Sequence, residues 1–472
     1  MTSDAKQLPT HVGARMTTQV PTPKAGSSPS TAISTGRRGA AVFVLAAYLL
    51  YLVTTPYERF VILSTVHLER ILALLLAGAC LAGTGIRPQV AKINLLWGAL
   101  IGLMVVSYIL SPYAETPSGR WWLTEYWKVL ALYVLVLWAI RSWADLSFVI
   151  TTLAFLGVAY QFYSWIDFVA GGSYVYQQGM RRIVGVWSGG GLGAPNSFAL
   201  LALLTLPAAA YCRRIAPSRL WRLSWVAAEC LCLLTILYSG TRGGLVCAVF
   251  YMVLSVGPKG FRWFAMGAPA AVAIAYLVLP TVIWERHTGW ITSSYDRAKQ
   301  SDRTAKESAE GRINGLIDGF SLAVHRPITG YGPNSSAIAR AVFRGASFEA
   351  ASSAYGDPKE DPPLALHNLW GQVVSELGFL GLAVFMATIG TFLTSLRRAG
   401  KVFSRVEGAE VQAAMARALF ELLAVYTAYG MFSHTLYRYQ WSLTLALCGS
   451  LMSLFLAQSW SAVRREQQIV SP

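Results

Sequence analysis

The sequence has little charge for its length. Of its 472 residues only 13% are charged, whereas 54% are hydrophobic, and an ordinary soluble domain has about 25% charged residues. The apolar residues also occur in long runs, such as 198–212, 224–238 and 264–283. These runs are close to the ~20 residues that a membrane-spanning helix needs. A soluble core cannot absorb so much apolar sequence, and an all-α integral membrane protein is predicted.

The sequence also lacks the usual patterns of metal and disulfide chemistry. It has no Asp-x-Asp motif and no His and Cys cluster with metal-ligand spacing, which disfavours a metal-dependent transferase. All six cysteines lie within or at the ends of apolar runs and are interpreted as small apolar filler. We therefore expect no cofactor, metal site or disulfide. The cysteines are Cys80, Cys212, Cys230, Cys232, Cys247 and Cys448.

The charges that are present predict a topology. The net charge is +16, but the Lys and Arg residues lie in short linkers between apolar runs, which indicates membrane orientation rather than a nucleic-acid partner. If the N-terminus is cytoplasmic, every linker on that side is basic and the C-terminus is cytoplasmic too. The runs predict about twelve spanning helices, near residues 40–54, 68–86, 93–111, 122–140, 146–169, 196–212, 223–239, 243–256, 263–283, 366–395, 416–432 and 436–458.

The remaining segments complete the predicted organisation. Residues 1–38 are rich in Ser, Thr, Pro and Gly and lack the apolar core of a cleavable signal peptide, so they predict a disordered cytoplasmic tail. Spanning helices 1–9 occupy 39–283, a large periplasmic loop occupies 284–365, helices 10–12 occupy 366–458, and a cytoplasmic tail occupies 459–472. Within the loop, Ile313, Leu316, Ile317, Phe320 and Val324 follow helical spacing. They predict an amphipathic helix on the membrane surface or against the bundle.

Five arginines lie on the outer side of this topology, although Lys and Arg are expected mainly in the cytoplasmic linkers. Because a guanidinium is planar and always charged, converging arginines suit a pyrophosphate group, while contact with lipid headgroups is the alternative for each. Arg242 favours a site most strongly, since it lies in Gly240-Thr241-Arg242-Gly243-Gly244 between two apolar runs. The five are Arg181, Arg182, Arg242, Arg312 and Arg438.

A histidine motif follows the large loop. His367-Asn368 is followed after nine residues by Gly378-Phe379-Leu380-Gly381, and on a helix His367, Gly371, Val374 and Gly378 would share one face. A neutral His can take a proton from a sugar hydroxyl, although a lone His at a helix end is more often structural. His434 lies four residues before Arg438 and could line the same cavity. His287 and His325 are competing candidates, and His325 better suits a turn.

These motifs resemble those of the O-antigen ligases and the related O-antigen or exopolysaccharide polymerases, over roughly residues 180–460. The most specific parts are 240–244, Gly311-Arg312, the segment 325–332 (His-Arg-Pro-Ile-Thr-Gly-Tyr-Gly), and His367-Asn368 with Glu376-Leu377-Gly378 and Gly381. Their order and spacing match the family. Leu382 stands where ligases usually have Thr or Val, which departs from the ligase pattern.

The resemblance implies an inverting, metal-independent glycosyltransferase of the GT-C type in the bacterial inner membrane. Its donor would be a glycan on undecaprenyl pyrophosphate at the periplasmic face. His367 would be the base or would position the acceptor, and Arg242 would lie near the pyrophosphate with Arg312 as its partner. The resemblance assigns the same role to Arg181, Arg182 and Arg438 less directly, because the residues around them match the family only loosely. Asn368, Glu376 and His434 are the candidates for acceptor binding or positioning.

Several functions remain open at this point. A ligase would transfer the glycan to a second acceptor such as lipid A core, whereas a polymerase would join repeat units on the same carrier. A lipid-linked glycan flippase or permease would use the arginines without any reaction, and His367→Ala would then leave transport intact. A protein glycosylase is less favoured, because the sequence shows no added soluble domain for protein substrates.

Overall fold

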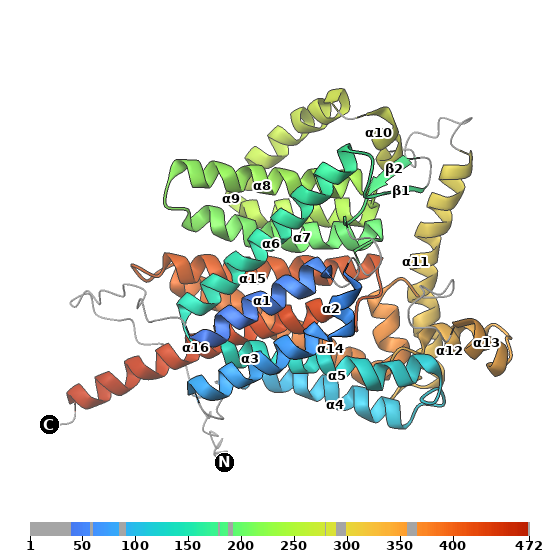
Figure 1. The fold of residues 1–472 in the computed structure, drawn as a ribbon, viewed down its shortest axis with the longest axis horizontal. Coiled ribbons are helices and arrows are strands. Elements are labelled where there is room, and N and C mark those ends of the chain that lie inside the picture. Colours follow the sequence, from blue (N-terminus) through green and yellow to red (C-terminus); the bar gives the residue numbers. More distant parts are fainter. Residues whose placement is uncertain are drawn as a thin grey trace, which may run out of the picture.

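The computed structural model describes residues 39–56, 60–84, 91–177, 180–186, 192–278, 280–288, 299–355 and 366–470. The predicted tail 1–38 lies outside these residues. The described chain is almost entirely helical (Figure 1). Its helices are α1 Ala40–Thr54, α2 Val61–Thr65, α3 Leu68–Thr84, α4 Asn94–Ile109, α5 Pro117–Ala139, α6 Trp143–Val169, α7 Pro195–Ile215, α8 Arg219–Tyr238, α9 Arg242–Val278, α10 Thr281–Thr288, α11 Lys299–His325, α12 Ser336–Phe343, α13 Phe348–Tyr355, α14 Leu369–Phe403, α15 Glu410–Tyr429 and α16 Tyr439–Val470.

Seven helices among the described residues are long and apolar enough to cross a membrane: α5, α6, α7, α8, α14, α15 and α16. α1, α4 and the first part of α9 are apolar but shorter. The predicted class of helical membrane protein is therefore confirmed, while twelve spans and the GT-C arrangement stay predictions. One small hairpin interrupts the helices in the described part of the chain, since β1 (Tyr174–Gln177) pairs antiparallel with β2 (Met180–Ile183).

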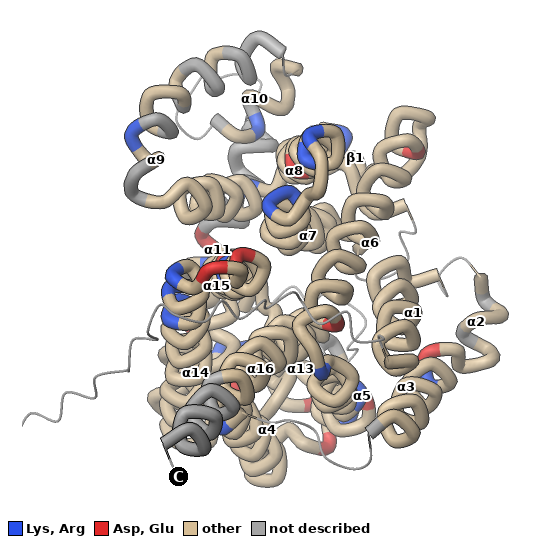
Figure 2. The backbone as a smooth tube through the Cα atoms, turned by 90° about the vertical axis from the view of Figure 1, so that its left-hand side faces the viewer, with Lys and Arg blue, Asp and Glu red and all other residues tan. Residues whose placement is uncertain are grey.

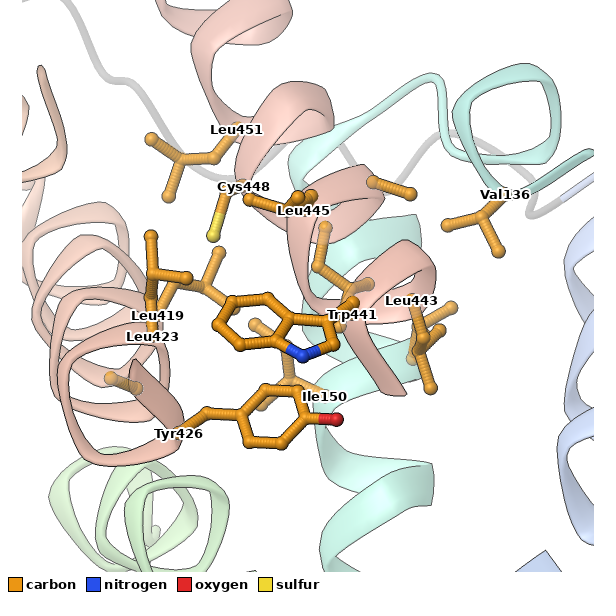
Figure 3. Close-up of a cluster of buried hydrophobic side chains, with 14 of the residues drawn as sticks. Val136, Ile150, Leu419, Leu423, Tyr426, Trp441, Leu443, Leu445, Cys448 and Leu451 are labelled. Carbon is orange, nitrogen blue, oxygen red and sulfur yellow. The ribbon is translucent and has the colours of Figure 1, made fainter. Parts of the chain in front are cut away.

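The helices pack around a core of large side chains. In Figure 3, Trp441 of α16 stacks on Tyr426 of α15, with ring centroids 4.2 Å apart. Leu419 and Leu423 of α15 and Ile150 of α6 surround this pair. Because lipid tails are as apolar as Leu, such helices associate mainly through close van der Waals packing. This packing fixes α15 and α16, and therefore the connection between them.

The two ends of the bundle differ. β1, β2 and α10–α13 gather at one end, on the right of Figure 1, which we call the hairpin end. Figure 2 looks onto the opposite end, where Lys and Arg residues mark the α7–α8 and α14–α15 connections. We call this the basic end. It carries Arg213, Arg214, Arg397 and Arg398, which belong to the linkers predicted to be cytoplasmic.

Two long helices are broken at glycines. Gly257 (φ 68°) divides α9, which agrees with the two separate helices predicted at 243–256 and 263–283. Gly378 (φ 69°) divides α14, where the sequence predicted one continuous helix. Left-handed φ values are readily adopted by glycine alone. The predicted helical face of His367, Gly371, Val374 and Gly378 is therefore wrong, because α14 begins at Leu369 and His367 itself has φ 47°.

The segment 327–332 packs against the break in α14. The amide of Phe379 donates to the Pro327 carbonyl (2.7 Å), while the carbonyls of Ser375 and Glu376 accept from the amides of Tyr331 (2.9 Å) and Gly332 (3.0 Å). These bonds supply partners for the backbone groups that the break removes from the helical ladder. Two separate sequence motifs are thus structural partners of one another.

α11 packs against α14 through glycine. A Cβ added at Gly319 would lie 2.5 Å from Gly371 Cα, so the two backbones can approach closely only without side chains there. Of the five apolar residues that predicted an amphipathic helix, four are exposed: Ile313 (61%), Ile317 (55%), Phe320 (39%) and Val324 (68%). Leu316 is half-buried, and together with Ile313 it lines a cavity of the bundle. The exposed side chains form an apolar surface of the kind that faces lipid.

Candidate active site

Four arginines converge on one cavity of about 400 Å³ at the hairpin end, which we call the arginine cavity. They come from β2, α9, α10 and α11, which are far apart in the sequence. The cavity is lined by Arg182, Asn196, Gly240, Thr241, Arg242, Gly243, Val246, Arg286, Arg312, Ile313, Leu316, Asn368, Met431 and Phe432.

Strand β2 places Arg182 inward and Arg181 outward, as alternation along a strand requires. Arg182 is only 5% exposed. Its Nε donates to the Ser239 carbonyl (2.6 Å), and one Nη lies 3.3 Å from Thr241 Oγ1. Burial lowers the pKa of Arg182 to about 10, so the guanidinium stays protonated at neutral pH. Its described partners are neutral, which leaves its positive charge available to an anion.

Arg242 and Arg286 hold one another in place at the start of α9. Arg242 Nε donates to the Arg286 carbonyl (3.0 Å), and Arg286 Nε donates to the Gly240 carbonyl (3.2 Å). Gly240 has φ 62°, and a Cβ there would meet Met180 Sδ at 2.9 Å. Glycine is therefore required at the turn that presents Arg242. Sequence reasoning missed Arg286, whose only signal was its place after the ninth apolar run, beside His287.

Arg312 completes the cluster from α11. Its Nε donates to the Phe432 carbonyl (3.2 Å). Burial, together with the nearby charge of Arg242, lowers the pKa of Arg312. No carboxylate lines the arginine cavity among the residues that the structure describes, and its remaining wall includes Val246, Leu316 and Phe432. The cavity thus combines strong positive charge with apolar surface, which suits a phosphate group attached to a lipid.

The histidine motif lies beside this cavity. Asn368 caps α14, because its Oδ1 accepts from the amides of Trp370 (3.0 Å) and Gly371 (3.1 Å). Its Nδ2 donates to the Met431 carbonyl (3.2 Å), and Asn368 also lines the arginine cavity. The ring of the adjacent His367 lies 5.3 Å from that of His434, between centroids. The structure therefore brings these two predicted histidines together.

Two predicted arginines lie elsewhere. The Arg181 guanidinium lies over the rings of Tyr174 (4.1 Å) and Phe168 (4.6 Å), and it does not line the arginine cavity. Arg438 donates from Nη1 to Ser197 Oγ (3.0 Å) and lines a different cavity. Both lie at the hairpin end, as predicted for the outer face, but they do not join Arg242.

Glu376 is 1% exposed and holds the loop before α12. Its carboxylate accepts from the amides of Asn334 (3.0 Å) and Ser336 (3.3 Å) and from the Tyr437 hydroxyl. Among the competing histidines, His325 is exposed, with Nδ1 2.9 Å from the Ser321 carbonyl. His287 Nε2 lies 3.2 Å from the Leu237 carbonyl, and burial lowers the pKa of His287.

A larger cavity lies elsewhere and does not mark this site. It has a volume of about 1140 Å³ and is lined by residues such as Arg214, Gly257 and Lys401. Arg214 lies at the other end of α7 from Asn196, so about 27 Å of helix separates the two cavities. Charge, rather than volume, identifies the candidate site.

The fold and the cavity define a helical membrane protein that presents clustered arginines at one end of its bundle. Residues 227–386 match the model of the family described as O-antigen ligase. Residues 227–386 of the chain are therefore similar to the O-antigen ligase and polymerase-related family, which confirms the resemblance predicted from the motifs. The matched region holds Arg242, Arg286, Arg312 and His367. No curated protein matches the sequence.

Proposed function

We propose that this protein is an O-antigen ligase-type glycosyltransferase of the bacterial inner membrane. It transfers a glycan from undecaprenyl pyrophosphate to an acceptor sugar, lipid A core, at the periplasmic face. The observation that carries the proposal is the convergence of Arg182, Arg242, Arg286 and Arg312 on one cavity with an apolar wall. Paired guanidinium hydrogen bonds suit the oxygens of a diphosphate, and the apolar wall suits the first units of the polyprenyl chain.

The chemistry is a single displacement at the anomeric carbon of the donor sugar. The acceptor hydroxyl oxygen forms a bond to this carbon while the bond to the diphosphate breaks, which inverts the configuration. The hydroxyl proton passes to a neutral imidazole of His367, or it passes to an oxygen of the leaving diphosphate while His367 orients the hydroxyl. The leaving diphosphate takes the electron pair, and the four guanidinium groups stabilise the charge that develops on it. Charge from arginine takes the place of a metal ion in this scheme.

A transfer assay with purified protein in lipid nanodiscs tests the proposal. Native protein receives undecaprenyl-pyrophosphate-linked glycan together with either lipid A core or a second lipid-linked unit, with and without EDTA. We expect product on lipid A core, no effect of EDTA, and loss of product in His367→Ala. Arg181→Ala serves as the control, because its guanidinium packs on aromatic rings outside the cavity.

The other outcomes correct the proposal in defined ways. A ladder of products on the carrier would identify a polymerase instead of a ligase. Transport of the lipid-linked glycan without transfer, unchanged in His367→Ala, would identify a flippase. Full transfer activity in a folded His367→Ala variant would remove His367 from the reaction.

A further inference from the structure

A second cavity of about 400 Å³ lies at the hairpin end, and the proposed reaction gives it no role so far. It lies among the ends of α1, α3, α5 and α16, and six aromatic side chains line it, so we call it the aromatic cavity. They are Tyr48, Tyr51, Trp121, Tyr126, Tyr437 and Tyr439.

Four of these six rings are buried in the protein, and Trp121 and Tyr439 are half-buried. Membrane proteins often carry Trp and Tyr at the lipid interface, but such residues are exposed on the outer surface. Tyr48 is 3% exposed, Tyr126 2% and Tyr437 9%. Trp127 on the same helix as Tyr126 is 55% exposed and does not line the cavity. The aromatic cavity is therefore a separate feature from an interfacial belt.

Polar groups line the same cavity. Glu69, Glu125, Lys128, Arg438 and Gln440 contribute to its wall. The hydroxyl of Tyr126 and Oε1 of Gln440 are buried and have no hydrogen-bond partner among the described residues. Buried polar atoms are nearly always paired, and the described protein groups do not use the hydrogen-bonding capacity of these two atoms. A hydrocarbon chain would leave both atoms without partners.

The lining matches the chemistry of a carbohydrate. A sugar ring has an apolar face of C–H groups that packs on an aromatic ring, and hydroxyl groups around its edge that donate to carboxylates and amides. The two carboxylates offset the charges of Lys128 and Arg438, so this cavity has no net attraction for a diphosphate. The arginine cavity, by contrast, has four cationic side chains and no described carboxylate.

The two cavities are joined by shared segments of chain. Phe432 lines the arginine cavity, His434 faces His367, and Tyr437 lines the aromatic cavity. Five residues span at most about 18 Å between the Cα atoms of Phe432 and Tyr437. At the start of α7, Asn196 lines the arginine cavity while its neighbour Ser197 accepts from Arg438. The histidine pair therefore lies on the chain between the two cavities.

We propose that the aromatic cavity binds the acceptor glycan. This inference rests on the proposed function, because it assigns each of the two substrates of that reaction to a cavity of its own. The diphosphate of the donor occupies the arginine cavity, and the acceptor sugar stacks in the aromatic cavity so that its hydroxyl reaches His367 between them.

The test measures KM separately for the donor and for the acceptor in the nanodisc assay, for Trp121→Ala and Tyr126→Phe. We expect Trp121→Ala to raise the acceptor KM about tenfold, which corresponds to about 1.4 kcal/mol of lost aromatic packing. Tyr126→Phe removes one hydroxyl and should raise it about threefold. Both variants should keep the donor KM within about twofold. Trp127→Ala is the matched control on the same helix and should change neither constant.

A binding measurement separates this inference from the proposed function. Core oligosaccharide released from its lipid, or the oligosaccharide of one repeat unit, is titrated onto the protein without donor. Binding that weakens in Trp121→Ala but not in Trp127→Ala upholds the aromatic cavity even if native protein transfers no glycan. An unchanged acceptor KM and unchanged oligosaccharide binding in folded Trp121→Ala and Tyr126→Phe would overturn the inference, and so would an equal rise in donor KM.

Discussion

The arginine cavity and the aromatic cavity have the same volume, about 400 Å³ each, and lie at the same end of the bundle. Their linings differ sharply in charge. One has four arginines and no described carboxylate, while the other has Glu69 and Glu125 as well as Lys128 and Arg438 among its aromatic rings. Two cavities of equal size in this bundle therefore offer different chemistry to a ligand. The difference lies in the charge and the hydrogen-bonding groups of their linings.

The two cavities also come from different parts of the chain. Most residues that line the arginine cavity fall within residues 227–386, the region that matches the O-antigen ligase family. Every residue that lines the aromatic cavity falls outside this region. A family that uses one kind of leaving group with many different acceptors would be built in this way. The common diphosphate would be held by the shared region and the acceptor by the rest.

The largest effect is expected for a substitution of Arg242, which tests whether the arginine cavity differs from the aromatic cavity in binding the donor. Arg242→Ala removes one of the four guanidinium groups that we propose stabilise the leaving diphosphate. We expect kcat/KM for the donor to fall about 100-fold, as for the loss of one donor group to developing charge. Steady-state transfer kinetics measure it, and Arg181→Ala should stay within about twofold. Equal losses in both variants would mean that general positive charge, rather than the arginine cavity, serves the reaction.

A second prediction concerns Glu376, which lines neither cavity. Glu376→Gln keeps the shape of the side chain but replaces the carboxylate with a weaker hydrogen-bond acceptor for the amides of Asn334 and Ser336. We expect a loss of about 2 kcal/mol in the free energy of unfolding. Thermal unfolding in detergent measures this loss. Glu349→Gln, an exposed glutamate at the start of α13, is the control. If Glu376 contacts the acceptor instead, stability will be unchanged and the acceptor KM will rise.

The third prediction tests the arginine that sequence reasoning missed. Arg286→Ala should raise the donor KM about tenfold, because one of the charge-assisted hydrogen bonds to the diphosphate is lost. The acceptor KM should not change. Arg344→Ala is the control, since that arginine is 48% exposed and pairs with Asp318 away from the cavity. A rise in KM for both substrates would mean that Arg286 supports the fold rather than the donor.

The sequence predicted the helical class, and three of its predicted site residues lie in or beside the arginine cavity: Arg242, Arg312 and His367. Runs of apolar residues locate helices directly, because lipid requires continuous apolar surface. Arg242, Arg312 and His367 could be found because the glycines and the Asn beside them form motifs. The break of α14 could not be predicted, since Gly378 is one glycine in an otherwise regular helix. It becomes understandable only once 327–332 is seen to supply its hydrogen bonds.

Arg286 and the aromatic cavity escaped prediction for a different reason. Arg286 follows an apolar run with no surrounding motif, and only the fold brings it to Arg242. Tyr48, Glu69 and Trp121 come from three helices whose neighbours are set by packing at long range. Periodicity describes each helix by itself and contains no information about which helices meet. Residues gathered from several helices therefore need the structure.

The smallest predicted effect sharpens the comparison at Arg438, which the sequence assigned to pyrophosphate and the structure places in the aromatic cavity. Arg438→Gln keeps a donor for Ser197 Oγ and should preserve the fold. We expect the acceptor KM to rise about threefold, the loss of one hydrogen bond. Inhibition of transfer by inorganic pyrophosphate should be unchanged, whereas Arg242→Ala should weaken it. If Arg438→Gln weakens this inhibition as well, Arg438 reaches the diphosphate, and the two cavities act as one site during transfer.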